Sequence, residues 1–163
     1  MGSEDWKQQL VRVAPSYAKR LAEPLPDDVE DTLAELRDVG IDLPEDLVAF
    51  LATFDDGDRL NLQGLGGQLQ HLHDLYGVLE ANHPDEGTYG NLVAEGEIPQ
   101  GVVMIGYGMT QLLYDGVGAL GPKGSYWSTS DMSVDRDSAT QLATSLVELL
   151  RGARPMPGEH DER

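Results

Sequence analysis

The spacing of hydrophobic residues changes near residue 102, and this change limits the folds open to the chain. Before it, apolar residues recur every three or four positions, which is the period of a helix that buries one face. After it, short apolar runs alternate with glycine-containing turns, a pattern typical of β-strands. We therefore expect an α+β fold: an antiparallel sheet with N-terminal, central and C-terminal helices packed on it.

Apolar stripes and their boundary residues predict where the helices lie. Pro15 interrupts the first stripe, Gly40 suits the end of the second, and Pro44 followed by two acids suits the start of the third. A stripe that begins at Leu69 ends before Pro84. The expected helices cover residues 6–14 with one more turn before 24, then 26–40, 44–54, 69–82 and 139–152.

The predicted strands are short, and brief turns separate most of them. Leu60 and Leu62 alternate with polar residues before the glycine-rich loop 63–67. Consecutive strands joined by short turns indicate an antiparallel meander. The expected strands of that meander are residues 102–105, 111–114, 117–120 and 125–128. We expect residues 5–152 to form a single domain and residues 153–163 to form a flexible tail.

Acidic residues dominate the charge of this chain. Twenty-nine acids and eleven bases give a formal net charge of −18. Such a field repels phosphate backbones and anionic lipid heads, and it attracts basic macromolecules. We therefore expect a protein partner with a basic surface, and neither nucleic acid nor a membrane. The alternative, that the acidity serves solubility or follows a proteome-wide bias, stays open.

Several kinds of site and location are disfavoured by composition. The chain has no cysteine, which excludes disulfides, thiolate nucleophiles and cysteine-ligated zinc. It has no apolar run of 18 residues, and its first residues do not resemble a signal peptide. A cytoplasmic location is expected.

The motifs that would carry catalysis or bind a cofactor are weak. On the expected helix, His71 and His73 point about 200° apart, so both cannot face one metal ion. His71 with Asp74 would supply only two ligands, fewer than zinc requires. The loop Gly64-Leu65-Gly66-Gly67 lacks the lysine and hydroxyl residue of a phosphate-binding loop. We expect no enzyme activity, no metal and no cofactor, with a metal enzyme at His71 and Asp74 as a minor alternative.

Two groups of residues are candidates for contact with a partner. The first is acidic and follows the third expected helix, where a turn ends it: Asp55, Asp56 and Asp58. The second is aromatic, because aromatic side chains dominate interface energetics, and it lies in the sheet region: Tyr107, Tyr114 and Trp127. The alternative for these aromatics, which the pattern favours, is packing in the core and across neighbouring strands. Neighbouring strand residues face opposite sides of a sheet, so Tyr126 and Trp127 must point in opposite directions.

Several local signatures, in this order, resemble the SUKH superfamily, which takes its name from a fungal cell-wall assembly regulator. They are an N-terminal helix with Trp6, the helix entry at Gly40-Ile41-Asp42-Leu43-Pro44, the turn Phe54-Asp55-Asp56-Gly57, the strand ending Ile105-Gly106, the hairpin through Tyr114-Asp115, the strand with Tyr126-Trp127, and a last helix ending in Leu149-Leu150. The resemblance covers roughly residues 5–152.

The resemblance implies a function, because bacterial members of this superfamily are commonly immunity proteins against secreted toxins. It implies a non-enzymatic, protein-binding domain that neutralises a toxin by direct association. The alternative that it implies is a scaffold or regulator of cell-envelope or signalling assemblies. Neither the resemblance nor the residues predict an oligomeric state.

Overall fold

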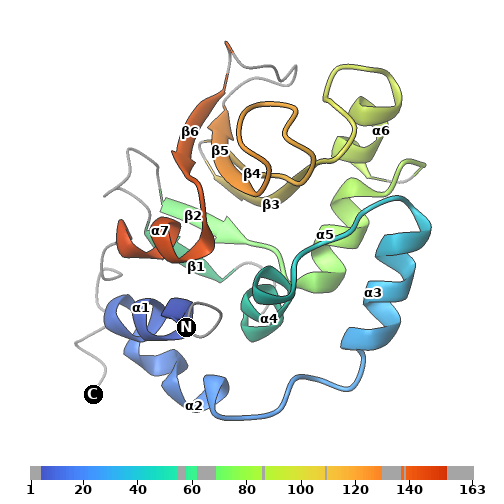
Figure 1. Cartoon of the computed structure of the whole chain (residues 1–163). Coiled ribbons are helices and arrows are strands. Elements are labelled where there is room, and N and C mark those ends of the chain that lie inside the picture. Colours follow the sequence, from blue (N-terminus) through green and yellow to red (C-terminus); the bar gives the residue numbers. More distant parts are fainter. Residues whose placement is uncertain are drawn as a thin grey trace.

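The structure is a computed structural model, and it describes residues 5–54, 58–61, 69–85, 87–108, 110–129, 137 and 139–153. These residues form an α+β fold, as the sequence predicts: helices from the beginning, middle and end of the chain surround an antiparallel sheet (Figure 1). The division into residues 5–152 and a flexible tail stays a prediction, because residues 154–163 lie outside the described part of the chain.

The helical elements begin close to where the sequence places them in the first third of the chain. Pro44 is the N-cap residue of the fourth helix, and Gly40, at φ 89°, follows the third. The helices are α1 (Asp5–Val13), the 3₁₀ turn η1 (Pro15–Tyr17), α2 (Ala18–Leu21), α3 (Val29–Asp38), α4 (Glu45–Thr53), α5 (Leu75–Asn82), α6 (Thr88–Ala94) and α7 (Leu146–Arg151).

The sheet is an antiparallel meander in which every strand pairs with the next one in the sequence. The spatial order therefore equals the chain order, and its part β3–β4–β5 is the meander that the short turns predict. The strands are β1 (Arg59–Asn61), β2 (Leu69–Leu72), β3 (Val102–Gly108), β4 (Gln111–Asp115), β5 (Ser125–Thr129) and β6 (Thr140–Ala143).

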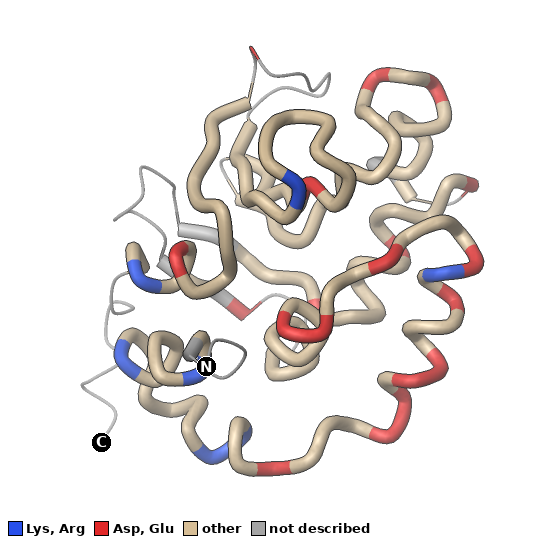
Figure 2. The backbone as a smooth tube through the Cα atoms, viewed as in Figure 1, with Lys and Arg blue, Asp and Glu red and all other residues tan. Residues whose placement is uncertain are grey.

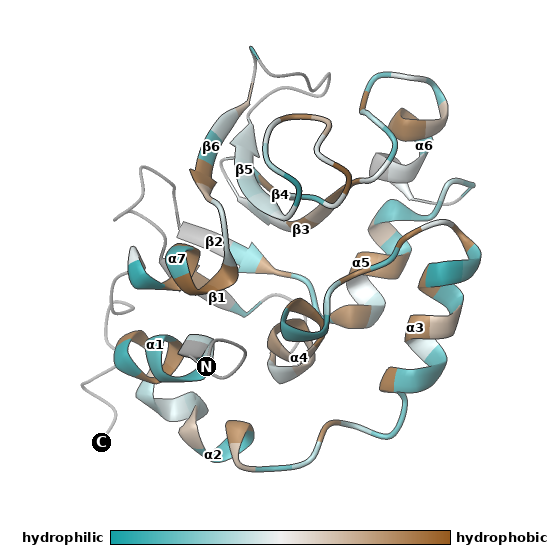
Figure 3. Ribbon diagram, in the orientation of Figure 1, coloured by the Kyte–Doolittle hydropathy of each residue, from teal (hydrophilic) through white to brown (hydrophobic). Residues whose placement is uncertain are grey.

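The two faces of the sheet bury two separate groups of side chains. On one face, Val103, Ile105 and Tyr126 join the main core beneath the helices. Most of α4 is hydrophobic (Figure 3), and it adds Phe50, whose ring meets that of Trp6 edge-on at 5.8 Å. On the other face lies a smaller cluster of Ile98, Val102, Leu113, Leu120 and Trp127. Tyr126 and Trp127 thus point in opposite directions, which confirms the prediction from strand geometry.

The expected helix over 69–82 is wrong in its first half. Leu69–Leu72 is strand β2, which pairs with β1 on one side and β3 on the other. Helix α5 begins only at Leu75, where the Asp74 carboxylate accepts a hydrogen bond from the Gly77 N–H at 2.8 Å. The leucine spacing fits either element, and pairing on both sides favours the strand because it satisfies the backbone.

The expected helix over 139–152 is also two elements. Residues Thr140–Ala143 form the edge strand β6, and α7 begins at Leu146. Its cap is Ser145, whose hydroxyl accepts from the Glu148 N–H at 3.0 Å. In the sequence, the acids and the serine of residues 135–138 suit the start of this last helix, but they do not cap α7, because α7 begins later in the chain. Of these four residues, Asp135, Arg136 and Ser138 lie outside the described part of the chain.

The segment 117–120, expected as a strand, is instead a loop built around the buried carboxylate of Asp115. This side chain is 0% exposed. Oδ1 accepts from the N–H groups of Val117, Gly118 and Ala119, and Oδ2 accepts from those of Leu120 and Gly121, at 2.7 to 3.2 Å. Five backbone donors that a strand partner would satisfy are satisfied by one carboxylate.

The first and last helices lie beside each other (Figure 1). From α1, Arg12 Nη2 donates to the carbonyl oxygens of Leu150 and Arg151 at 3.0 Å and of Ala153 at 3.3 Å. Carbonyl groups at a helix C-terminus carry partial negative charge, which a guanidinium neutralises. Arg12 therefore links the two ends of the fold.

Candidate interaction surface

Charge is unevenly distributed over the protein. Residues 23–46 contain ten acids and one base, whereas residues 6–22 contain four bases and no acid. Figure 2 shows the result in space: acidic residues follow α3 and the segments on either side of it, and basic residues gather on α1 and α2. We call α3 with its flanking acids, residues 23–46, the acidic face.

A groove adjoins the acidic face, and we call it the α2–α5 groove. It has a volume of about 400 Å³ and runs between the segment after α2, the start of α3, the end of α4 and the start of α5. Val29, Phe54 and Leu75 supply apolar lining. Acidic side chains also line it: Glu23, Asp28 and Asp74. The groove therefore combines apolar surface with negative charge.

Two apolar side chains of this groove are exposed. Among the described residues, only four large apolar side chains are exposed by a third or more: Leu25 (48%), Tyr76 (53%), Tyr107 (36%) and Val117 (59%). Leu25 and Tyr76 both line the α2–α5 groove. Exposed apolar residues gathered at one concave place indicate a contact surface more strongly than isolated ones do.

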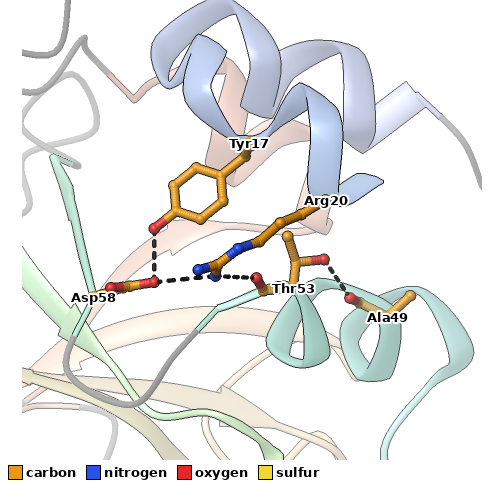
Figure 4. Close-up of polar contacts among 5 residues, drawn as sticks. All are labelled: Tyr17, Arg20, Ala49, Thr53 and Asp58. Carbon is orange, nitrogen blue, oxygen red and sulfur yellow. Dashed lines mark hydrogen bonds and ion pairs between the residues drawn. The ribbon is translucent and has the colours of Figure 1, made fainter. Parts of the chain in front are cut away.

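One end of the groove is held by a polar network around Asp58 (Figure 4). The Tyr17 hydroxyl donates to Asp58 Oδ2 at 2.7 Å, and Arg20 Nη1 lies 3.7 Å from the same oxygen. Arg20 also donates to the Thr53 carbonyl oxygen at the end of α4, at 3.0 Å, and its guanidinium lies 5.5 Å from the centre of the Tyr17 ring. These contacts join α2 to the end of α4 and the start of β1.

The structure describes only one of the three acidic residues expected to contact a partner. Asp58 is not among the residues that line the α2–α5 groove; it is engaged by Tyr17 and by the groove residue Arg20, with its side chain 30% exposed. Asp55 and Asp56 lie outside the described residues. A role for Asp58 in partner contact stays a prediction, but its carboxylate already has an internal function.

Two of the three expected aromatic contacts are buried, which corrects their placement at the surface. Trp127 is 7% exposed and its Nε1 donates to Ser125 Oγ at 2.7 Å. Its ring also lies against the loop after Asp115, since a Cβ on Gly121 would fall 2.6 Å from it. Tyr114 is 6% exposed. Their rings face the two cores, because apolar layers cover both sides of the sheet.

Tyr107 is the accessible aromatic of that set, and it lies between two histidines. His71 on β2 is its partner in the strand register and stacks on it with ring centres 5.2 Å apart. His73 contacts it at 5.0 Å. The predicted divergence of the two histidines on a helix is wrong, because His71 lies on strand β2 and the backbone N–H of His73 extends the pairing by donating to the Ile105 carbonyl oxygen at 3.1 Å.

The structure does not bring these histidines into a metal centre. In the described part of the chain, no group of three or more His, Cys, Asp or Glu side chains has the arrangement of a metal site. The glycine-rich loop considered for phosphate binding lies outside the described residues.

A second hollow, of about 390 Å³, lies between the segment joining α3 to α4 and the start of β3. Tyr114 lines it together with Asp42 and Lys123. Burial raises the pKa of the Tyr114 hydroxyl, and the carboxylates of Asp46, Asp115 and Asp42 raise it further. The phenol is therefore held in its neutral, hydrogen-bonding form.

Tyr126, next to Tyr114 on the sheet, gives a prediction for alkaline solution. Burial, with smaller effects from Asp46 and Tyr114, raises the pKa of Tyr126 well above its ordinary value of 10.0. The unfolded chain releases this proton near pH 10 while the folded chain keeps it, so stability is complete below pH 10 and falls as pH rises. Tyr126→Phe should remove this contribution and make the loss above pH 10 less steep, by up to about 1.4 kcal/mol per pH unit.

Urea denaturation between pH 8 and 11 measures this loss. Tyr76→Phe is the matched control, because Tyr76 is exposed. Equal slopes for wild type and Tyr126→Phe would contradict the assignment.

The residues that build the groove have only weak signals in the sequence. Leu25 stands between Pro24 and Pro26, beside Asp27 and Asp28, in a segment that cannot be helical. An apolar residue in such a place has no element to pack with. Tyr76 belongs to the leucine stripe in the sequence, but α5 buries Leu75, Val78 and Leu79 and leaves Tyr76 53% exposed.

Comparisons with known proteins add no evidence on the function of this chain. No protein-family model, no curated protein and no solved structure matches the chain. Among the described residues, none of the helices has the length and apolar content needed to span a membrane.

Proposed function

We propose that this protein is a binding domain that associates with a basic protein through the acidic face. In the particular form that the SUKH resemblance implies, the partner is a toxin and the domain is its immunity protein. Neutralisation then follows from tight association, which blocks the active site or the exit route of the toxin.

The observation that carries this proposal is the separation of charge. Ten acids and one base within 24 residues give the segment 23–46 a formal charge of −9 (1 − 10), half of the total of −18. A concentrated charge of one sign steers an oppositely charged partner and raises its association rate by about 10- to 1,000-fold. Charge scattered evenly along the chain would not place half of the net total in 24 of 163 residues.

The test compares two sets of substitutions that change net charge equally. The first removes four exposed acids of the acidic face: Glu30→Gln, Asp31→Asn, Glu35→Gln and Asp38→Asn. The control removes four exposed acids from the region of α5 and α6: Glu80→Gln, Asp85→Asn, Glu95→Gln and Glu97→Gln. Both variants have a formal charge of −14 (−18 + 4).

The partner is first isolated from native cells by affinity capture, identified by mass spectrometry and purified. Its association rate with each variant is then followed by stopped-flow fluorescence between 20 and 300 mM salt. We expect the first set to slow association by at least about tenfold at low salt and the control set by much less. A rate that responds neither to salt nor to the first set would refute the proposal.

The toxin form of the proposal needs a separate measurement. One equivalent of the protein should abolish the toxic activity of the partner in a purified assay. A partner without toxic activity would leave a binding domain of a resident assembly, the alternative that the sequence leaves open.

A further inference from the structure

The α2–α5 groove has the chemistry of a recognition site for one kind of side chain. Its apolar part consists of Leu25 and Tyr76, which are about half exposed, above the buried Val29 and Leu75. An aliphatic chain laid against Leu25 and Tyr76 would remove this apolar surface from water. Burial of apolar surface contributes about 25 cal/mol per Å².

The polar part of the groove selects for positive charge. Glu23 and Asp28 are exposed and line the groove, and neither has an ion-pair partner among the described residues. The last residues of α4, Ala52 and Thr53, also line it. A helix C-terminus carries partial negative charge, which adds to that of the two carboxylates.

The cation already present does not neutralise this part of the groove. Arg20 lines it, but its guanidinium is engaged by the Asp58 carboxylate and the Thr53 carbonyl oxygen (Figure 4). Arg20 also shows the contacts that a second cation would make, since it lies over the Tyr17 ring while it pairs with a carboxylate. Tyr76, Glu23 and Asp28 offer the same kinds of group at the open part of the groove.

We propose that the α2–α5 groove receives an arginine or lysine of the partner protein, presented on an exposed segment beside a leucine-like side chain. The aliphatic stem and the neighbouring apolar side chain cover Leu25 and Tyr76, and the charged head lies near Glu23 and Asp28. Long basic side chains commonly bury their stems in this way while the head stays hydrated. This inference rests on the proposed function and locates its binding site.

Two synthetic peptides of equal charge test the groove without knowledge of the partner. One is acetyl-Gly-Arg-Leu-Arg-Leu-Arg-Gly-amide, and in the other both leucines are replaced by serine. Titration is followed by NMR in 150 mM salt on the full chain. We expect the leucine peptide to bind at least tenfold more tightly and to shift the resonances of Ala52, Thr53 and Leu75.

Substitutions in the protein supply the second arm. Leu25→Ser with Tyr76→Ser should weaken binding of the leucine peptide at least tenfold. Val117→Ser should leave it unchanged, because Val117 is equally exposed but lies outside the groove. Glu23→Gln with Asp28→Asn should weaken binding of both peptides. Equal affinity of the two peptides, or equal binding by the Leu25/Tyr76 variant and wild type, would overturn the inference.

The failure of the groove and the failure of the proposed function give different results. If the purified partner binds the Leu25/Tyr76 variant as tightly as wild type but still responds to the acidic-face set, only the groove is wrong. If the association rate of the partner changes neither with the Leu25/Tyr76 substitutions nor with the acidic-face set, the proposed function itself is wrong.

Discussion

Replacing Asp115 by asparagine should lower the free energy of unfolding by about 2–4 kcal/mol, because the carboxylate has no substitute among neutral side chains. Its two oxygens accept five backbone N–H groups and donate nothing in return. An asparagine keeps one acceptor and turns an NH₂ group toward at least two of those donors. Each donor left without an acceptor costs about 1–3 kcal/mol.

The loss should extend to the local structure of the loop. Leu120 and Trp127 belong to the smaller core cluster, and Leu120 is positioned by its N–H bond to Asp115. We therefore expect the fluorescence of Trp127 to change together with stability.

Urea denaturation followed by circular dichroism measures the effect of Asp115→Asn. Asp42→Asn is the control, because that side chain is 87% exposed and its pair with Arg37 is a surface contact worth little. A variant as stable as wild type would mean that the loop finds other acceptors and that the carboxylate is dispensable.

The reverse substitution at a second buried position, Asn82→Asp, should cost about 3–5 kcal/mol at pH 7. Asn82 is 7% exposed, and its amide makes a two-way connection between α5 and β3. Nδ2 donates to the carbonyl oxygens of Val78 at 2.9 Å and Met104 at 2.8 Å, and Oδ1 accepts from the Met104 N–H at 2.9 Å. An aspartate would place a negative charge against two carbonyl oxygens.

This second prediction has a definite pH dependence. Burial and the two carbonyl oxygens disfavour the charged form, so the pKa of the new carboxyl is raised in the folded state. The difference from wild type should therefore be smallest at or below about pH 4, where an unfolded aspartate is protonated, and should grow as pH rises.

Urea denaturation at pH 4, 5.5 and 7 measures the dependence. Asn91→Asp is the control, because Asn91 is an exposed asparagine on α6. A cost that does not change with pH would contradict the raised pKa and show that the new carboxylate reaches water.

The sequence predicts strands β3, β4 and β5 well, but it misses β2 and β6 and adds a strand at 117–120, where the loop bound to Asp115 lies. In β3, β4 and β5 the apolar runs lie between glycine turns, so length and turn chemistry decide the element. In 69–82 and 139–152 a strand passes into a helix within four residues, and the leucines of both elements fit one helical stripe. Only pairing with distant strands, which a local pattern does not contain, separates them.

The sequence predicts the charge of the candidate interaction surface but not its position. The excess of acids indicates a basic partner, but α3 collects them on one face only because its apolar side, with Val29 and Leu36, packs on the core. Two of the three aromatic candidates, Tyr114 and Trp127, are buried because apolar layers cover both faces of the sheet, whereas Tyr107 stays accessible. Tyr76, which the sequence groups with the leucines, lies in the first turn of α5 and is exposed while its neighbour Leu75 is buried.

The connection between α1 and α7 affects how the two ends of the fold unfold locally. Arg12 is bonded to three carbonyl oxygens at the end of α7, so neither helix can detach without breaking the contacts of the other. The two extremities of the fold therefore form a single cooperative unit of local unfolding. Fraying at either end is resisted by residues that are about 140 positions away in the sequence.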